Sequence, residues 1–303
     1  MTAQEFPSAA RCVPIAMRSL GVLADLRSWL AGPAAGLRNL PIEAMAISAA
    51  TIAPWRSVAQ LRAVARMYVW TYALDDHVEQ VVTSLPELDD LFARCLAIVH
   101  TGRSDTSHPI LTALSSCQQD LSAQPLYPAL ADLWAAKFAS DLEAVRYDWL
   151  VSRGDIPRTD IRDYLDHASS VTLWMNHFPL WATADDAALL DHLDVLVSAV
   201  DDLTVVVRLA NDLATFHRES RAGDNNILMY PGVTPAQVRT ELARRAESAT
   251  RRLSTLLDRD FPPAVELIRL LEWSTVFYSC GDFRGWGSDA PALATGDASN
   301  RVS

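Results

Sequence analysis

Three acidic residues continue an apolar helical pattern in the segment YVWTYALDDHVEQVV, residues 68–82. The apolar residues of that pattern recur at intervals of four and three, the spacing of one helical face: Leu61, Ala65, Tyr68 and Tyr72. Asp75, Asp76 and Glu79 occupy the next positions, and the four-residue spacing of Asp75 and Glu79 lets both carboxylates reach one ion. A buried carboxylate is costly unless a cation compensates it, so this face predicts a bound cation.

A second apolar face turns polar in the same way near residue 211. Its apolar positions also step by four and three: Leu189, Leu193, Leu196, Val200, Leu203 and Val207. The next steps of four reach Asn211, Thr215 and Glu219, in the segment RLANDLATFHRE. Their oxygen atoms are the ligands that a hard divalent cation prefers. Magnesium is the expected ion, because it binds a few carboxylates together with the phosphate oxygens of a substrate.

Aromatic side chains are expected to form the walls of an apolar cavity behind the two acidic faces. The candidates are Tyr68, Tyr72, Trp70, Trp149, Trp174, Phe178, Trp181, Trp273 and Phe277. Such a cavity suits an apolar substrate with a diphosphate head. It also suits a reaction in which diphosphate leaves and aromatic faces stabilise the remaining carbocation.

The elements that must position these residues are predicted to be helices, since helical periodicity runs nearly throughout and no strand pattern stands out. Shorter helices are expected before residue 50, and the later ranges are roughly 55–80, 86–101, 109–122, 128–152, 158–182, 185–219, 235–258 and 263–282. Residues 1–285 are expected to form one all-α domain, and residues 286–303 a disordered tail. Ser169 and Ser170 mark either a helix break that turns carbonyl groups into the cavity or a plain continuous helix.

Composition narrows the class of protein. The chain has 303 residues, of which 50% are hydrophobic, and nine Trp, so it is expected to form a globular protein with a sizeable core. A net charge of −11 disfavours binding to nucleic acid, which needs a basic surface. The four scattered Cys are expected to be reduced thiols. The N-terminal segment lacks the apolar core of a signal peptide, and no membrane span is predicted, so a cytoplasmic protein is expected.

The segments DDHVE (75–79) and NDLATFHRE (211–219) resemble the aspartate-rich motif and the Asn-Asp…Ser/Thr…Glu motif of bacterial class I terpene synthases. The resemblance covers roughly residues 50–285 and implies a single-domain helical bundle around a central apolar cavity. It also implies a cluster of three magnesium ions that triggers ionisation of a prenyl diphosphate. The resemblance implies that its ligands are Asp75, Asp76 and Glu79 on one side and Asn211, Thr215 and Glu219 on the other. The expected catalytic residues are Asp75, Asn211, Thr215 and Glu219.

Three arginines match positions at which the family binds diphosphate. Arg208 precedes Asn211 by three residues, and Arg218 directly precedes Glu219. Arg284 corresponds to the arginine of a C-terminal Arg-Tyr pair, although Gly285 and Trp286 follow it and the tyrosine is missing. The alternative for Arg208 is an ordinary ion pair with Asp212 at i+4, and the alternative for the other two is a surface arginine.

A second departure from the family pattern concerns the substrate. Sesquiterpene synthases of bacteria usually carry a diphosphate-sensing arginine four residues after the tyrosine that corresponds to Tyr164, where this chain has Ala168. Bacterial diterpene synthases that act on a copalyl-type diphosphate can also lack this arginine. The resemblance therefore favours a diterpene synthase, a lyase of bacterial isoprenoid secondary metabolism, with a copalyl-type diphosphate as substrate or geranylgeranyl diphosphate as the other C20 possibility.

The sequence contains no D-x-D-D motif for protonation-initiated cyclisation, so a separate class II cyclase would have to supply a bicyclic substrate. A homodimer is expected only by analogy with the family. Two alternatives stay open, a sesquiterpene synthase acting on farnesyl diphosphate and a non-catalytic helical scaffold. A chain-elongating prenyltransferase is disfavoured, because it would carry a second aspartate-rich motif in place of NDLAT.

Overall fold

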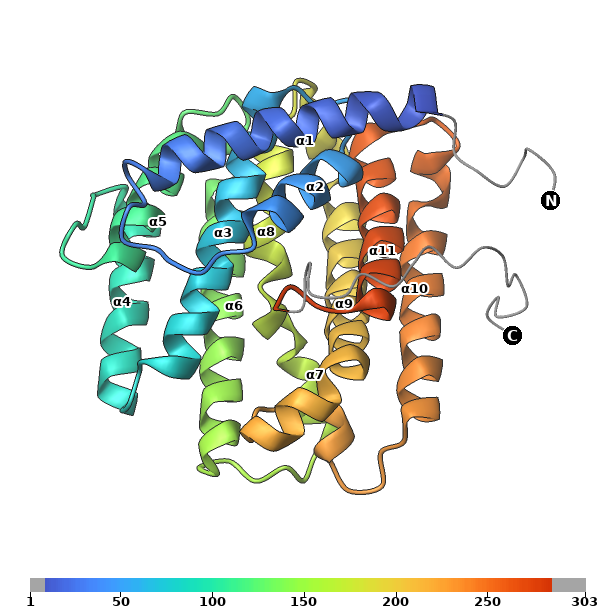
Figure 1. Cartoon of the computed structure of the whole chain (residues 1–303). Coiled ribbons are helices and arrows are strands. Elements are labelled where there is room, and N and C mark those ends of the chain that lie inside the picture. Colours follow the sequence, from blue (N-terminus) through green and yellow to red (C-terminus); the bar gives the residue numbers. More distant parts are fainter. Residues whose placement is uncertain (1–8, 285–303) are drawn as a thin grey trace.

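The computed structural model describes residues 9–284, so the predicted disordered tail, Gly285 and Trp286 lie outside the described residues. Eleven α-helices and three short 3-10 helices make up this part of the chain, which contains no strand (Figure 1). The prediction of an all-α fold is therefore confirmed. None of the helices in residues 9–284 combines the length and apolar character needed to cross a membrane.

The helix bounds define the elements used below. The α-helices are α1 (Ala9–Leu30), α2 (Ile42–Ile52), α3 (Val58–Gln80), α4 (Leu85–Thr101), α5 (Pro109–Ser122), α6 (Tyr127–Arg153), α7 (Ile161–Asp166), α8 (Leu173–Ala182), α9 (Leu193–Ala222), α10 (Pro235–Leu257) and α11 (Pro262–Cys280). The 3-10 helices are η1 (Ala168–Val171), η2 (Ala187–His192) and η3 (Ile227–Met229).

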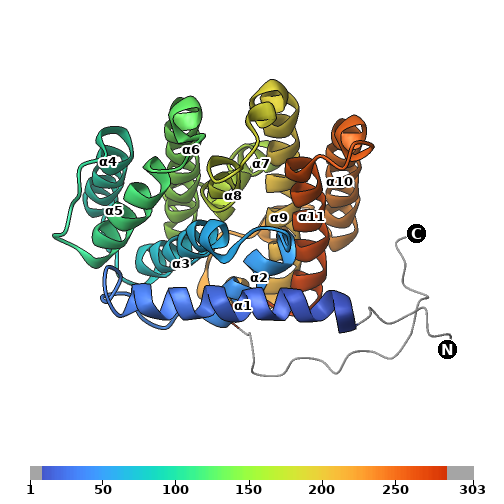
Figure 2. The same ribbon diagram turned by 90° about the horizontal axis from the view of Figure 1, so that it is seen from above.

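The long helices form a bundle, and α1 runs across it beside α2 and α3 (Figures 1 and 2). α9 packs against both α10 and α11, while α8 lies between α3, α6 and α9. The apolar faces predicted from the sequence are buried in this bundle: Leu61 and Ala65 of α3, and Leu196, Val200 and Leu203 of α9, have no exposed surface. The helices that carry the two polar motifs are thus held in place by their own apolar faces.

The chain between residues 158 and 182 is not one helix, and the alternative of a break at the serines is correct. α7, η1 and α8 divide the segment, and Thr172 has a left-handed backbone with φ of 52°. The buried carboxylate of Asp141 accepts a hydrogen bond of 3.1 Å from the backbone N–H of Met175, in the first turn of α8. This contact from α6 stabilises a helix start where the sequence pattern alone continues without interruption.

Two other boundaries differ from the prediction. The helix expected from residue 185 begins as the 3-10 helix η2, and α9 starts only at Leu193. The helix before α2 is not short, because α1 extends over 22 residues with Pro14 inside it. Pro14 has no N–H to donate to the carbonyl of Ala10, so α1 continues through it with one backbone hydrogen bond fewer near its start.

A buried ion pair joins the segment between α2 and α3 to α11. Nε of Arg56 donates a hydrogen bond of 2.7 Å to Oε1 of Glu266, and the side chains are 6% and 0% exposed. Removing one partner leaves the other charge buried and uncompensated. We expect Glu266→Ala to lower the free energy of unfolding by about 3–5 kcal/mol in urea titrations followed by circular dichroism.

The matched control for this variant is Glu43→Ala, which removes the exposed partner of Arg27. Exposed ion pairs contribute little, so the control is expected to change the free energy of unfolding by less than about 1 kcal/mol. Equal, small losses for both variants would contradict the assignment of a stabilising buried pair.

Candidate active site

One cavity of about 410 Å³ opens between α2, α3, α6, α9 and α11. Its volume lies within the range of roughly 300–1,000 Å³ that is typical of sites for small organic ligands. Five of the nine aromatic residues predicted to form its walls line it, among them Tyr68, Tyr72, Trp273 and Phe277. The fifth is Trp149 of α6.

Trp174 and Phe178 do not line the cavity, although the sequence placed them there. Phe178 is fully buried against Trp134, with ring centroids 4.7 Å apart. The indole N–H of Trp174 donates to Asp201, and the ammonium group of Lys137 lies over its ring. Both residues follow the break at Thr172, so a helical face extrapolated across residues 158–182 does not describe their direction. Trp70 and Trp181 are likewise core residues outside the lining.

The acidic end of α3 supplies two of its three carboxylates to the cavity. Asp75 and Glu79 line it, whereas Asp76, the next residue around the helix, does not. Burial raises the pKa of Asp75 well above its ordinary value, and the nearby carboxylate of Glu79 adds to this rise. Burial also raises the pKa of Glu79, an effect that the charge of Arg284 opposes. The pair is therefore a site at which a cation is favoured.

The polar end of α9 faces the same cavity from the other side. Asn211 and Glu219 line it. Thr215 lies between them on the helix but is buried, and its hydroxyl donates a hydrogen bond of 2.8 Å to the backbone oxygen of Asn211. The structure thus brings together four of the six predicted ligands along one cavity, with Thr215 directly behind Asn211 and Asp76 outside the lining.

The short segment after α11 connects the two acidic ends. Arg284 forms ion pairs with Glu79 and, at 3.9 Å, with Asp75. On the α9 side, Nη2 of Arg218 lies 3.3 Å from Oε1 of Glu219 and 3.2 Å from Oδ2 of Asp282. Arg218 and Arg284 therefore supply positive charge at the positions where the sequence predicted that a cation is needed.

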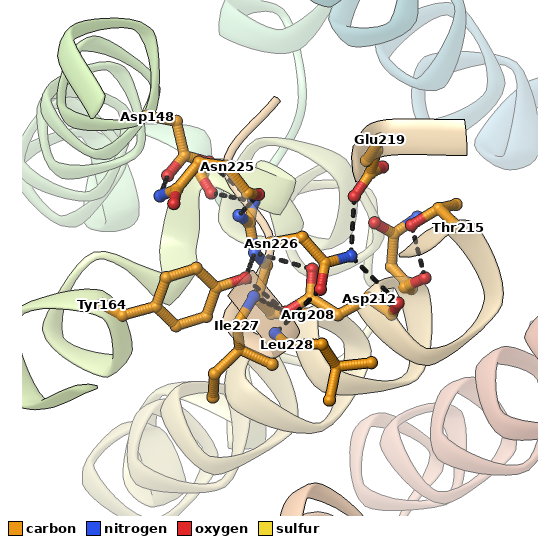
Figure 3. Close-up of polar contacts among 12 residues, drawn as sticks. Asp148, Tyr164, Arg208, Asp212, Thr215, Glu219, Asn225, Asn226, Ile227 and Leu228 are labelled. Atoms are coloured by element: carbon orange, nitrogen blue, oxygen red, sulfur yellow. Dashed lines mark hydrogen bonds and ion pairs between the residues drawn. The ribbon is translucent and has the colours of Figure 1, made fainter. Parts of the chain in front are cut away.

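Arg208 occupies a more enclosed position on the cavity wall (Figure 3). Its Nε donates to the hydroxyl of Tyr164, and its Nη2 donates to the backbone oxygen of Asn225 at 2.7 Å. Its Nη1 donates to Oδ2 of Asp148 at 2.6 Å and to Oγ of Ser170 at 2.7 Å. Each nitrogen of this guanidinium already has a protein partner.

Asp212 is paired with Arg208, as the alternative drawn from the sequence proposed, and it points away from the cavity. Its Oδ1 lies 3.4 Å from Nε of Arg208. Its Oδ2 accepts hydrogen bonds from the hydroxyl of Tyr164 and, at 3.4 Å, from the backbone N–H of Ile227. Burial raises the pKa of Asp212 to about 7, which the charge of Arg208 partly opposes.

Three residues of this network were not anticipated from the sequence, namely Asp148, Asn225 and Asn226. Asp148 belongs to α6 and accepts a hydrogen bond of 2.7 Å from the side chain of Asn225. Asn226 donates to the carboxylate of Glu219 at 2.9 Å. The signals available were a carboxylate flanked by the aromatic residues Tyr147 and Trp149 and an Asn pair shortly after the second motif, in the stretch AGDNNILMYPG.

The residues present fit magnesium in their chemistry. Carboxylate and amide oxygens from α3 and α9 face one cavity, and such oxygen donors are those that magnesium prefers. Within residues 9–284, no three His, Cys, Asp or Glu side chains already form a compact metal-binding group. The two halves therefore stand as separate sets of ligands on opposite walls.

Comparison with known proteins gives relatives in sequence and in structure. No protein-family model matches the chain. It is 52% identical over 277 residues to ent-pimara-9(11),15-diene synthase of Streptomyces sp. (strain KO-3988), over 89% of this chain and 93% of the relative.

The solved structures share the fold at much lower identity. Linalool/nerolidol synthase from Streptomyces clavuligerus matches with a TM-score of 0.66 and 16% identity, over 85% of this chain and 95% of that one. A variant of cucumene synthase matches with a TM-score of 0.63 and 16% identity, over 88% and 94% of the two chains. At this level of identity, the likeness concerns the fold.

The hydroxyl of Tyr164 tests the network around Arg208. Tyr164→Phe removes an acceptor for Arg208 and a donor to Asp212, both of which are buried. Leaving buried polar groups unsatisfied costs about 1–3 kcal/mol each, so we expect a loss of that order in the free energy of unfolding in urea.

The control is Tyr127→Phe, which removes a partly buried hydroxyl that accepts from Gln118, far from the cavity. Its expected loss is about 1 kcal/mol or less. A larger loss for the control than for Tyr164→Phe would contradict the role given to the Arg208 network.

Proposed function

We propose that this chain, which belongs to the bacterial class I terpene synthases, acts on a copalyl-type diphosphate. It is a diterpene synthase, a lyase that releases diphosphate. The observation that carries the proposal is the 52% identity to a pimaradiene synthase over most of both chains. A pimaradiene is a tricyclic C20 hydrocarbon, which a bicyclic C20 diphosphate can form by one further ring closure. Geranylgeranyl diphosphate is the alternative C20 substrate.

The position of Ala168 supports this choice. Ala168 is 2% exposed and packs in a small apolar cluster with Tyr164 and Leu209, outside the cavity lining. Because this residue is alanine, the chain lacks the arginine with which sesquiterpene synthases usually sense diphosphate at this position. Ser170, two residues later, lines the cavity and is bound by Arg208.

We propose that Asp75 and Glu79, with Asp76 as an outer contributor, hold magnesium on the α3 side. Asn211, Thr215 and Glu219 would hold it on the α9 side, for a total of three ions as in the family. When bound, magnesium neutralises charge on the diphosphate and favours its departure. The hydroxyl oxygen of Thr215 is available for this role through its lone pairs while the hydroxyl donates to Asn211.

Arg218 and Arg284 are proposed to contact the diphosphate directly. Their side chains are 37% and 30% exposed, and their present partners are carboxylates at the same cavity mouth. An exposed ion pair exchanges partners at little cost. Arg208, also proposed for diphosphate binding, lies in the same wall, and each of its three nitrogens already donates to a protein group. Its proposed contribution is to hold the wall and to add positive potential.

The deeper wall is proposed to enclose the hydrocarbon part of the substrate and to exclude water. Residues from α2, α3 and α11 supply this apolar surface: Met45, Ile52, Tyr68, Leu270, Trp273 and Phe277. Aromatic faces there can stabilise a carbocation. No side chain stands out as a general base, so the released diphosphate is proposed to accept the final proton.

Partners follow from the same chemistry. The sequence contains no D-x-D-D motif, so a separate class II cyclase is proposed to supply the bicyclic diphosphate. A homodimer remains a proposal by analogy with the family.

Product analysis tests the proposed substrate. Purified protein with magnesium is incubated separately with copalyl, geranylgeranyl and farnesyl diphosphates, and products are identified by gas chromatography–mass spectrometry. We expect a C20 hydrocarbon or alcohol from copalyl diphosphate, and a loss of more than about 100-fold in Asn211→Ala, because a direct ligand is removed.

Each other outcome has a definite meaning. Product from geranylgeranyl diphosphate alone would overturn the bicyclic substrate and keep the reaction class. Product from farnesyl diphosphate alone would overturn the C20 preference as well.

A further inference from the structure

The side chain of Asn226 lies in the loop between α9 and η3 and has no exposed surface (Figure 3). Its Nδ2 donates hydrogen bonds of 2.9 Å to Oε2 of Glu219 and 3.0 Å to the backbone oxygen of Asp212. Its Oδ1 accepts a hydrogen bond of 3.0 Å from the backbone N–H of Leu228. Both amide hydrogens and the amide oxygen are therefore used, and exchanging the two ends of the amide would break all three contacts.

The loop that carries this amide is itself anchored. Its residue Asn225 receives Nη2 of Arg208 at the backbone oxygen and donates from its side chain to Asp148. The backbone N–H of Ile227 donates to Asp212. Because α6 and α9 both hold the loop, Asn226 approaches Glu219 from a fixed direction.

Glu219 differs in this respect from the acids of α3. Asn226 occupies one side of Oε2, while Oε1 lies 3.3 Å from Arg218, toward the cavity. Asp75 and Glu79 have an arginine as their described partner, and a salt bridge at a cavity mouth fixes a carboxylate less firmly. A buried amide donor sets the rotation of the Glu219 carboxylate before any ligand arrives.

We propose that Asn226 is a positioning residue that aims the carboxylate of Glu219 at the metal site. The inference rests on the proposed function, because it takes Glu219 to be a metal ligand. The amide chemistry is specific: a carboxylate at this position could not donate to Glu219 and would repel it. Partners that orient a ligand typically change metal affinity by about 10–100-fold when they are removed.

Asn226→Ser is the most informative variant. Asn226 is the N-cap of η3, and its side chain accepts a hydrogen bond from the backbone N–H of Leu228. A serine keeps an oxygen that can accept this bond, so the start of η3 is preserved. Its shorter side chain loses the donor to Glu219. Asn226→Ala removes all three contacts and is the second variant.

The matched control is Gln118→Ser, which truncates another buried amide. Gln118 is 3% exposed, accepts from the indole of Trp134 and donates to Tyr127, remote from the metal ligands. It is expected to lower thermal stability with no change in metal affinity.

Affinity for Mn²⁺ in the presence of inorganic diphosphate is measured by electron paramagnetic resonance on the full-length proteins. We expect Asn226→Ser to weaken Mn²⁺ binding about tenfold. In steady-state assays the magnesium concentration for half-maximal rate should rise by a similar factor, and saturating magnesium should restore most of kcat. A merely structural role would instead lower the melting temperature and leave the metal dependence unchanged.

Wild-type affinity for Mn²⁺ in both folded Asn226 variants would overturn the positioning role while leaving the proposed function intact. Failure of the unaltered protein to bind Mn²⁺ with diphosphate would overturn the metal site itself, and the inference with it. The two failures are therefore distinguishable.

Discussion

The buried guanidinium of Arg208 is the constraint on which the rest of the cavity mouth depends. A buried charge is costly unless it is paired and fully hydrogen-bonded. Arg208 is paired with Asp148 of α6 and with Asp212 of its own helix α9. Its nitrogens also donate to Tyr164 of α7, Ser170 of η1 and the backbone of Asn225. Moving α6 away would remove a paired carboxylate, and moving α7, η1 or the Asn225 loop away would remove a hydrogen bond from this buried group, so the network holds one wall of the cavity in a defined shape.

This constraint separates the arginines of the mouth into two physical kinds. Arg208 is 7% exposed and each of its three nitrogens donates to a protein group, so it fixes the geometry of the wall. Arg218 and Arg284 are more exposed and paired with carboxylates that face the cavity, so their partners can change at little cost. Binding and later releasing a multiply charged group requires both kinds of arginine. A rigid wall orients the ligand, and arginines that can leave their carboxylate partners can pair with the charge of the ligand.

Much of the site could be predicted from the sequence, because helical periodicity records which side chains share a face. Asp75, Glu79, Asn211 and Glu219 reach one cavity for that reason, and the apolar residues that precede them are buried.

Periodicity could not predict the break near Thr172, since it depends on Asp141 and Arg208, which lie 34 and 38 residues from their partners there. A break changes the phase of the helix, so the directions of Trp174 and Phe178 could not be extrapolated. The Asn226 contact was hidden for a similar reason, as loop geometry leaves no periodic signal.

The same cavity must combine a strongly polar end with a dry interior. Polar side chains in its wall would attract water unless they were hydrogen-bonded to one another. Thr71 lies one helical turn before Asp75, and its hydroxyl donates at 2.8 Å to Oδ1 of Asn176. Nδ2 of Asn176 donates in turn at 3.2 Å to the hydroxyl of Thr172. Because these groups satisfy one another, they have less need of water than isolated polar groups would. Their pairing supports the exclusion of water next to a reactive cation, and it links α3 to the break that the Arg208 network holds in place.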